Sequence, residues 1–259
     1  MTTFSSNTQQ SATVPPAWPD NERTARLCAE TALFMRDHVL SLVSHDLRSP
    51  LNAIHSWAYV LERKLDAGDA TTQRAITGIR SGVDQQVKLL ESLVDTTRAE
   101  TKSLALARAP FALAAMIDAT ADAVRTPFAQ ARAVTVTSGS TLAGERLNGD
   151  AERLAQALWL MLTFAIETSV RETSVALENT LDGTTWQATV TFTPAPAALG
   201  DAALPHLLEA FARRQAQEPR EVGRIAWVLA LCRRVAEAHG GKFEQNEETL
   251  VLRVPLGAA

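Results

Sequence analysis

Residues 44–54 read Ser-His-Asp-Leu-Arg-Ser-Pro-Leu-Asn-Ala-Ile, and the apolar spacing that begins here decides the fold. Apolar side chains recur at alternating intervals of four and three residues, at Leu47, Leu51, Ile54, Ala58, Leu61 and Leu65. This spacing is typical of the seam of a coiled-coil or bundle helix. The pattern extends back through Val43 and Leu40 to Leu33, so it predicts one helix of roughly 40 residues.

A second helix is predicted after a break at Asp66–Asp69, with Asp69 placed to cap it. Its apolar positions are Ile76, Ile79, Val83, Val87, Leu90 and Val94. Two long helices joined by a short turn form an antiparallel hairpin, which cannot bury both apolar seams alone. We therefore expect a homodimer whose two hairpins form a four-helix bundle. The alternative is a hairpin that packs on its own C-terminal domain.

His45 is out of step with the apolar seam and is expected to face solvent. A single histidine on a helix is usually a surface or capping residue, but here a carboxylate, Asp46, follows it directly. Such a carboxylate, or a backbone oxygen, can hold Nδ1–H and leave the Nε2 lone pair as a nucleophile. Pro50 should kink the helix one turn later, at a cost of about 3 kcal/mol that is easier to understand beside a functional site.

The rest of the chain predicts three segments: a disordered tail at 1–21, the helical hairpin at 22–105 and an α/β domain at 110–259. Ala109-Pro110 marks the last boundary. Helices are predicted in this third segment at 111–131, 150–169, 204–213 and 224–238. Strands are predicted at 134–137, 174–179, 185–193, 241–246 and 249–254. The whole is an α+β protein whose C-terminal part is a two-layer sandwich with a mixed sheet.

Composition excludes several classes of function. The 259 residues include 25 Lys and Arg against 29 Asp and Glu, so a broadly basic nucleic-acid surface is not expected. No apolar run approaches the ~20 residues of a membrane span, and we expect no secretory signal and no membrane partner. Two distant cysteines, Cys28 and Cys232, favour reduced thiols in a cytoplasmic protein over a disulfide or metal framework.

Residues 45–54 resemble the phosphoacceptor box of two-component histidine kinases, with its pattern His-Asp/Glu-x-x-Ser/Thr-Pro-Leu-x-x-Ile. The resemblance implies that His45 carries a phosphoryl group and that Asp46 assists in handling the proton. Ser49 occupies the position where such proteins often have a Thr or Asn that orients water for dephosphorylation.

The resemblance covers residues 25–256 and implies an ATPase-type sandwich at the C-terminus. Three segments carry it. Asp150–Leu158 resembles the start of the helix with the Mg-binding asparagines, Leu204–Phe211 resembles the phenylalanine box, and Ala230–Gly241 resembles the helix and turn after the second glycine box.

The positions that would contact nucleotide depart from this family. Leu160 and Phe164 replace the two asparagines, unless they are simply core residues of a domain that never bound ATP. The glycine boxes are replaced by Pro-Ala-Pro-Ala-Ala at 194–198 and Arg-Ile-Ala-Trp-Val at 224–228. Each lost charged hydrogen bond costs roughly 1.5–3 kcal/mol, and three such losses move a micromolar site to millimolar or weaker. We expect no nucleotide, cofactor or metal on this chain, and no chelation by Glu152 and Glu167 instead.

The resulting hypothesis is a histidine phosphotransferase of a phosphorelay, which exchanges phosphate between His45 and receiver-domain aspartates without ATP. Its partners would be response-regulator receiver domains or a hybrid kinase, and the receiver would supply the Mg²⁺. The expected contact face is Ser49, Asn52, Ala53 and Ser56. Arg48 would neutralise the negative charge of the phosphoryl group on His45; the alternative is that it is an ordinary solvated side chain. For Asn52, a role in the contact face and a plain surface position are equally good interpretations.

Two alternatives stay open. The first is an active sensor-type autokinase with a divergent ATP site. The second is a non-catalytic module that sequesters a kinase or a response regulator. A phosphatase role through Ser49 is compatible with the main hypothesis.

Overall fold

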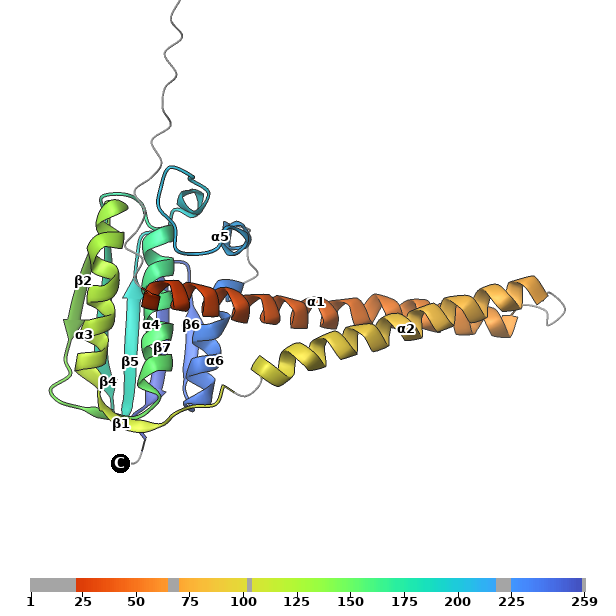
Figure 1. The fold of residues 1–259 in the computed structure, drawn as a ribbon, viewed down its shortest axis with the longest axis horizontal. Coiled ribbons are helices and arrows are strands. Elements are labelled where there is room, and N and C mark those ends of the chain that lie inside the picture. The colour runs from red at the N-terminus through yellow and green to blue at the C-terminus, as the bar shows by residue number, and fades with distance from the viewer. Residues whose placement is uncertain (1–21, 65–69, 102–103, 218–224, 258–259) are drawn as a thin grey trace, which may run out of the picture.

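The computed structural model describes residues 22–64, 70–101, 104–217 and 225–257. The predicted tail at 1–21 and the predicted cap at Asp69 lie outside these ranges. Helices α1 (Glu22–Lys64) and α2 (Ala70–Thr101) form the expected antiparallel hairpin, which projects from the rest of the molecule (Figure 1). The apolar period therefore predicted both the length and the pairing of these helices, and α1 continues through Pro50.

The hairpin buries only part of its predicted seam. Leu51 and Ala58 of α1 and Ile76 and Val83 of α2 are buried, which places them between the two helices. Other apolar residues of α1 remain exposed and form what we call the apolar stripe: Val43, Leu47, Ile54, Trp57 and Leu61. A single chain thus leaves an apolar face of α1 uncovered.

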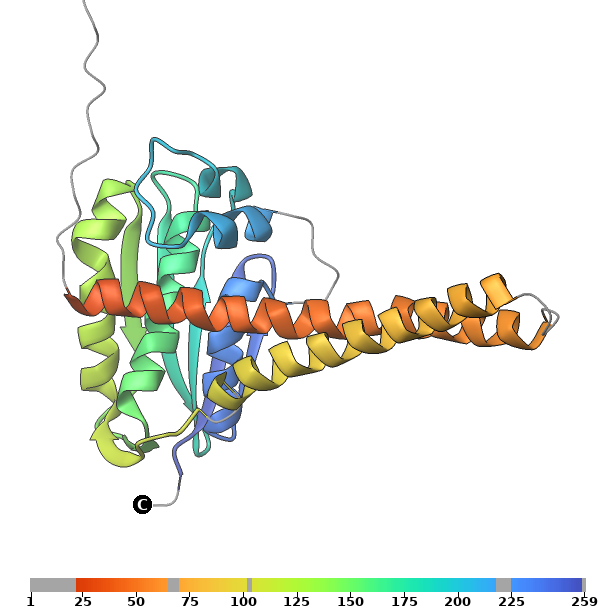
Figure 2. The same ribbon diagram turned by 45° about the vertical axis from the view of Figure 1, so that its right-hand side comes forward.

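The C-terminal part is a sheet covered on one face by helices, as expected for a two-layer sandwich. The five strands of the main sheet are β2 (Thr135–Ser140), β4 (Ser174–Asp182), β5 (Thr185–Thr191), β7 (Thr249–Pro255) and β6 (Lys242–Gln245), in this spatial order. Only β2 and β4 pair in parallel, so the sheet is mixed. The covering helices are α3 (Leu113–Val124), α4 (Ala151–Thr168) and α6 (Ala230–Ala238) (Figures 1 and 2).

Two short strands, β1 and β3, and a π-helical turn were not predicted from the sequence. Strand β1 (Ala109–Ala112) pairs antiparallel with β3 (Arg146–Gly149), so the helix predicted from residue 111 begins only at Leu113. After α3 the chain continues as a π-helical turn, η1 (Arg125–Ala129). Strand β1 carries no apolar alternation, because three of its four residues are exposed, and its pairing with a distant strand leaves no local signal.

The helix predicted at 204–213 was wrong in its position. Helix α5 spans Ala210–Gln217, and residues 204–209 are not helical. The backbone N–H groups of Leu207 and Leu208 instead donate to Oε1 of Glu167, at 2.7 and 2.9 Å. A buried carboxylate from another helix therefore replaces the helical hydrogen bonds that this segment would otherwise make.

The helix predicted at 224–238 begins later than expected. Among its described residues, Ile225 and Ala226 are not helical, and a 3₁₀ turn, η3 (Trp227–Leu229), leads into α6. A further 3₁₀ turn, η2 (Pro196–Leu199), was not predicted. The N–H of Ala226 donates to Oε1 of Gln245 at 2.8 Å, which fixes the start of this segment against β6.

Helix α4 is buried on every side from Leu154 to Thr168. The sheet covers one side and neighbouring helices flank it, while the start of α1 crosses its outer side (Figures 1 and 2). The carboxylate of Asp150 caps α4 by accepting from the N–H groups of Glu152 and Arg153. In the first third of α1, Leu27 and Met35 are buried in the same core, so this part of the hairpin does pack on its own C-terminal domain.

Candidate functional site

His45 lies on α1 beyond the part of the helix that crosses the sandwich. Its side chain is 81% exposed, and that of Asp46 is 76% exposed. The His45 Nδ1 atom lies 3.3 Å from Oδ1 of Asp46. The Asp46 carboxylate can therefore accept a hydrogen bond from Nδ1–H of His45. This leaves Nε2 as the ring nitrogen that is open to a reaction partner.

The predicted contact residues share one face of α1 with His45. Ser49, Asn52 and Ser56 follow His45 by four, seven and eleven positions, which places all of them on the same side of a helix. All three are exposed, as is Ala53, and Ser56 Oγ donates to the Asn52 carbonyl at 2.8 Å. The predicted residues thus follow His45 along one exposed face of α1.

Arg48 differs from the solvated cation considered in the sequence. Its side chain is only partly exposed.

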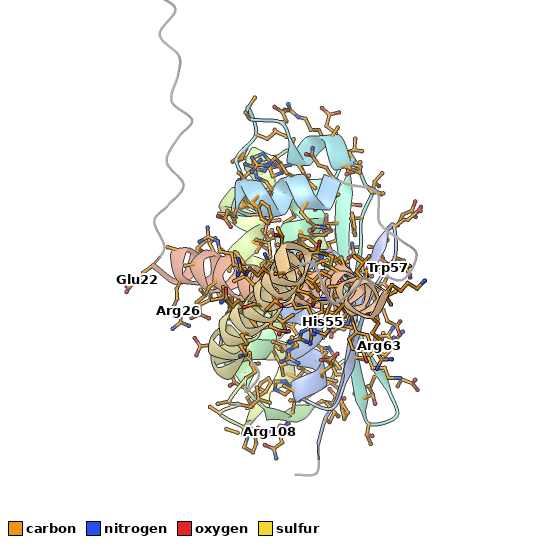
Figure 3. All side chains as sticks on the ribbon, turned by 90° about the vertical axis from the view of Figure 1, so that its right-hand side faces the viewer. Glu22, Arg26, His55, Trp57, Arg63 and Arg108 are labelled. Carbon is orange, nitrogen blue, oxygen red and sulfur yellow. The ribbon has the colours of Figure 1, made fainter. Side chains whose placement is uncertain are left out.

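The same hairpin carries polar features that the sequence reading missed. The guanidinium carbon of Arg63 lies 4.7 Å from the ring centroid of Tyr59, an i,i+4 pair that helical spacing alone could have suggested. A shallow cavity of about 520 Å³ lies between α1 and α2, where Arg80 bonds Glu62 at 2.6 Å. In Figure 3, Trp57 and Arg63 lie on the opposite side of the view from Glu22 and Arg26.

The segments that resemble nucleotide boxes meet in space, but their key side chains face inward. Leu160 and Phe164 are buried, and the Phe164 ring packs edge-on against Phe192 with centroids 6.3 Å apart. They are core residues, as the alternative reading of the sequence suggested. Asparagine-like ligands are absent at both positions, so the residues present do not fit a magnesium–nucleotide complex.

The two acidic residues near these boxes are engaged in other contacts. Glu167 has no exposed surface and accepts hydrogen bonds from the 207–208 backbone, and Glu152 forms an ion pair with Arg26. Within the described residues, no three His, Cys, Asp or Glu side chains lie close enough to share a metal ion.

Buried polar groups secure the loops around α4. Arg132 is buried and donates to the carbonyls of Pro205 and Glu167 at 2.6 and 2.7 Å; burial lowers its pKa. His239 is the C-cap residue of α6. Its Nδ1 donates to the Val235 carbonyl at 2.8 Å, and its Nε2 accepts from the Asp150 N–H at 3.0 Å. This geometry requires neutral imidazole, in accord with a pKa that burial lowers.

Both cysteines are free thiols. Burial raises the pKa of Cys28 to about 11 and also raises the pKa of Cys232. The Cys232 thiol donates to the Ala157 carbonyl at 3.4 Å, inside the core. Neither thiol has the environment of a reactive cysteine.

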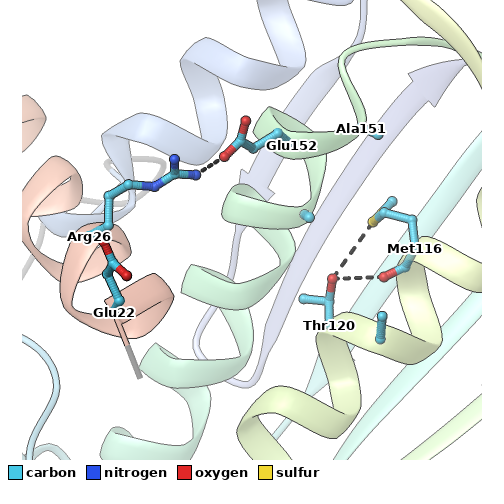
Figure 4. A pocket seen from close by; sticks show the side chains of 8 residues that line it. Glu22, Arg26, Met116, Thr120, Ala151 and Glu152 are labelled. Carbon is cyan, nitrogen blue, oxygen red and sulfur yellow. Dashed lines mark hydrogen bonds and ion pairs between the residues drawn. The ribbon is translucent and has the colours of Figure 1, made fainter. Parts of the chain in front are cut away.

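A larger cavity, of about 620 Å³, opens between the start of α1, α3 and the beginning of α4 (Figure 4). Its floor is formed by small and apolar side chains, and the Arg26–Glu152 ion pair borders it. Thr120 donates to the Met116 carbonyl at 2.7 Å. The cavity lies at the N-terminal end of α1, whereas His45 lies near the middle of that helix.

Comparison with known proteins supports the resemblance found in the sequence. Residues 35–102 match the His Kinase A (phospho-acceptor) domain. The crystal structure of a histidine kinase from Burkholderia phymatum STM815 is 56% identical, with a TM-score of 0.76 over 92% of this chain and 99% of that one.

Two curated proteins are more distant relatives. A sensor-like histidine kinase of Rhizobium meliloti (strain 1021) is 28% identical over 241 residues, and the signal transduction histidine-protein kinase BaeS of Escherichia coli (strain K12) is 27% identical over 211. The matches cover 89% and 81% of this chain but only 45% and 43% of those proteins. None of the described helices is long and apolar enough to cross a membrane. With a phosphoacceptor domain and a near-complete structural match at 56% identity, the chain belongs to the histidine kinase family.

Proposed function

We propose that this protein is a histidine phosphotransferase that exchanges phosphate between His45 and receiver-domain aspartates. The observation that carries the proposal is the exposed imidazole of His45, with Nδ1 facing Asp46 and Nε2 open to solvent. In the reaction, the Nε2 lone pair attacks the phosphorus of an aspartyl phosphate. The N–P bond forms, the acyl O–P bond breaks, and the receiver's carboxylate leaves. Asp46 stabilises the Nδ1 proton of the charged ring.

We infer that the phosphoryl group comes from a partner and not from ATP on this chain. Burial of Leu160 and Phe164 supports this proposal, because both positions face the core instead of a ligand. The Mg²⁺ that phosphoryl transfer requires would be bound by the receiver's own carboxylates, so this chain contributes no metal ligand.

The proposed partner is a receiver domain of a response regulator or a hybrid kinase. It would contact the exposed face that continues from His45 through Ser49, Asn52, Ala53 and Ser56. A second copy of the chain would cover the apolar stripe and complete a four-helix bundle. Two free cysteines are consistent with a cytoplasmic setting.

The second candidate is an autokinase with a divergent ATP site. The names of its relatives favour it, since they are sensor or signal-transduction histidine kinases. The match covers less than half of those proteins, and the nucleotide positions depart from the family pattern. For these reasons the phosphotransferase is the preferred proposal.

One experiment separates the two candidates. The purified protein is incubated in parallel with radiolabelled Mg-ATP and with receiver domains labelled on their aspartate, and acid-labile label on the chain is measured. We expect label only from the receivers, its loss in His45→Gln and its retention in the matched control His55→Gln, which changes a second histidine of α1. Label on His45 from ATP alone would establish the autokinase. No label from either donor would contradict both.

A further inference from the structure

Residues 104–108, which we call the linker, follow the hairpin and lead into strand β1 of the sandwich. The chain runs here along the lower end of the sandwich (Figures 1 and 2). Two hydrogen bonds hold the end of the linker. The N–H of Ala107 donates to Oδ2 of Asp150 at 2.9 Å, and Nη2 of Arg108 donates to the carbonyl of Ala238 at 2.7 Å. The linker is therefore attached both to the start of α4 and to the end of α6.

Asp150 is the centre of this junction. Its Oδ1 accepts from the N–H groups of Glu152 and Arg153 at 3.1 and 3.0 Å, while its Oδ2 accepts from the linker. The N–H of Asp150 itself donates to Nε2 of His239 at 3.0 Å. The same residue thus caps α4, holds the linker and has its own backbone fixed by the ring of His239.

The ring of His239 is tightly enclosed, since the residue is only 5% exposed. A Cβ atom on Gly149 would lie 2.9 Å from Cδ2 of the ring and 3.1 Å from Nε2, so the backbone before Asp150 packs directly on the imidazole. Burial lowers the pKa of His239 from 6.5. The Val235 carbonyl and the Asp150 carboxylate oppose this shift, and the Arg108 guanidinium adds to it. The charged groups that act on the ring therefore come from the linker and from the start of α4.

We propose that His239 is a proton-operated latch on the linker. The neutral ring accepts the Asp150 N–H and keeps this residue in place to bind Ala107. A protonated ring carries a hydrogen on Nε2 and cannot accept that bond, so two donors would face each other. The acceptor that the junction offers to the imidazolium is the Asp150 carboxylate, which must then give up the N–H of Ala107. The inference concerns the linker alone and stands whether or not His45 exchanges phosphate with receivers.

The direction of the pH effect follows from proton binding. The latched form excludes a proton that the released form binds with the ordinary pKa of 6.5. Above this pH both forms are neutral, and the latch has its full strength. Below it, release becomes more favourable by up to about tenfold per pH unit, until the latched form itself binds the proton.

Hydrogen exchange of the Ala107 amide measures release directly, because this N–H is bonded to Asp150 only in the latched form. The full chain is followed by NMR at pH 7.5 and 5, and protection factors are corrected for the pH dependence of intrinsic exchange. The Trp159 amide, in the buried part of α4, reports unfolding of the whole domain. We expect Ala107 to lose about tenfold or more of its protection at pH 5 and to stay less protected than Trp159 at both pH values.

The test variant is His239→Gln, whose side-chain oxygen can accept the Asp150 N–H at either pH. We expect the protection of Ala107 to change less than about twofold between pH 7.5 and 5 in this variant. The matched control is His55→Gln, which removes a histidine of α1 and should keep the wild-type response. If His239→Gln does not fold, Asp150→Asn serves instead. Asparagine is an equally good helix cap but offers an imidazolium no charge, so the response to pH should shrink at least about threefold.

Three results would overturn the inference. One is a wild-type Ala107 amide that keeps its full protection at pH 5. Another is an equal loss of protection in the wild type and in His239→Gln. The third is a loss at Ala107 that occurs only together with Trp159, because the junction would then open only by unfolding of the domain. None of these results bears on receiver-dependent labelling of His45, which is measured separately.

Discussion

His206 Nδ1 lies 2.8 Å from Oε2 of Glu167, a carboxylate with no exposed surface. The other ring nitrogen of His206, Nε2, lies 2.9 Å from the Asp201 carbonyl oxygen. Glu167 also accepts from the backbone of Leu207 and Leu208. This one carboxylate therefore attaches the segment 206–208 to the end of α4.

Replacing that carboxylate should destabilise the protein strongly. In Glu167→Gln the buried charge opposite His206 and Arg132 is lost, and one oxygen acceptor becomes a donor. We expect the free energy of unfolding to fall by about 3 kcal/mol, measured by urea denaturation. Glu178→Gln, an exposed change on β4, is the control and should alter stability by less than about 0.5 kcal/mol. Equal stability of both variants would contradict the anchoring role.

Asp46 should influence the rate of phosphoryl transfer but not the fold. Asp46→Asn keeps the side-chain shape and removes the charge beside Nδ1 of His45. We expect transfer from a phosphorylated receiver to slow about 100-fold in rapid-quench measurements, with unchanged circular dichroism. Asp118→Asn, an exposed change on α3, should transfer at the wild-type rate. A wild-type rate of phosphoryl transfer in Asp46→Asn would show that the Nδ1 proton of His45 needs no carboxylate beside it.

The apolar stripe of α1 should form the contact between two copies. Ile54→Asp places a charge in its centre, and we expect a monomer where the wild type has twice the 28.0 kDa chain mass in light scattering. Asn52→Asp introduces the same charge on the His45 face and should leave the mass at two chains. A wild type that is monomeric at micromolar concentration would contradict the bundle.

Acidic pH should weaken the contact between α1 and α6 through His38. Burial, together with the nearby Arg233 and Arg234 guanidiniums, lowers the pKa of His38 from 6.5 to about 4. Below pH 6.5 the unfolded chain binds a proton that the folded chain excludes until about pH 4, so stability falls as pH falls through this window.

The measurement compares thermal unfolding of the wild type and His38→Gln at pH 7.5 and 5. The variant should lose less stability on acidification. His239, whose pKa burial also lowers, affects both proteins alike, so the difference isolates His38. An identical loss of thermal stability in the wild type and in His38→Gln would contradict this prediction.

Two adjacent glycines in the turn after α6 should differ in how much stability the protein loses when each is replaced by alanine. A Cβ atom on Gly241 would lie 1.9 Å from the backbone carbonyl oxygen of Arg253, so Gly241→Ala must separate this turn from β7. We expect a loss of about 3 kcal/mol or more in urea denaturation. Gly240 has a φ of +76° and open space around it, so Gly240→Ala should cost only about 1–2 kcal/mol. A larger loss of stability in Gly240→Ala than in Gly241→Ala would contradict the close packing of Gly241 on Arg253.

Much of the fold was predictable from local patterns. The four-three spacing from Leu47 onward predicted α1, the apolar positions from Ile76 to Val94 predicted α2, and β5 lies within the strand predicted at 185–193. The segment 204–209 was wrongly predicted as helix, because its local composition does not reveal that Glu167 accepts the backbone hydrogen bonds of Leu207 and Leu208, 40 and 41 residues later.

The candidate site, too, was predictable in part. His45 and its neighbours follow one another on a single helix, so helical geometry alone placed Asp46, Ser49, Asn52 and Ser56 around it. The partial burial of Arg48 was not predicted from the sequence.

The sequence by itself determined the hairpin and the exposed histidine, because each is a matter of residue type and short-range period. Only the tertiary structure decided that the first turns of α1 lie in the cleft beside Trp159, while Leu47 and Ile54 stay uncovered. The physical reason is that apolar residues at helical spacing specify a face to be buried but not the surface that buries it. That choice depends on shape and charge contributed by distant segments, such as Glu209 for Arg36 and Arg153 for Glu30.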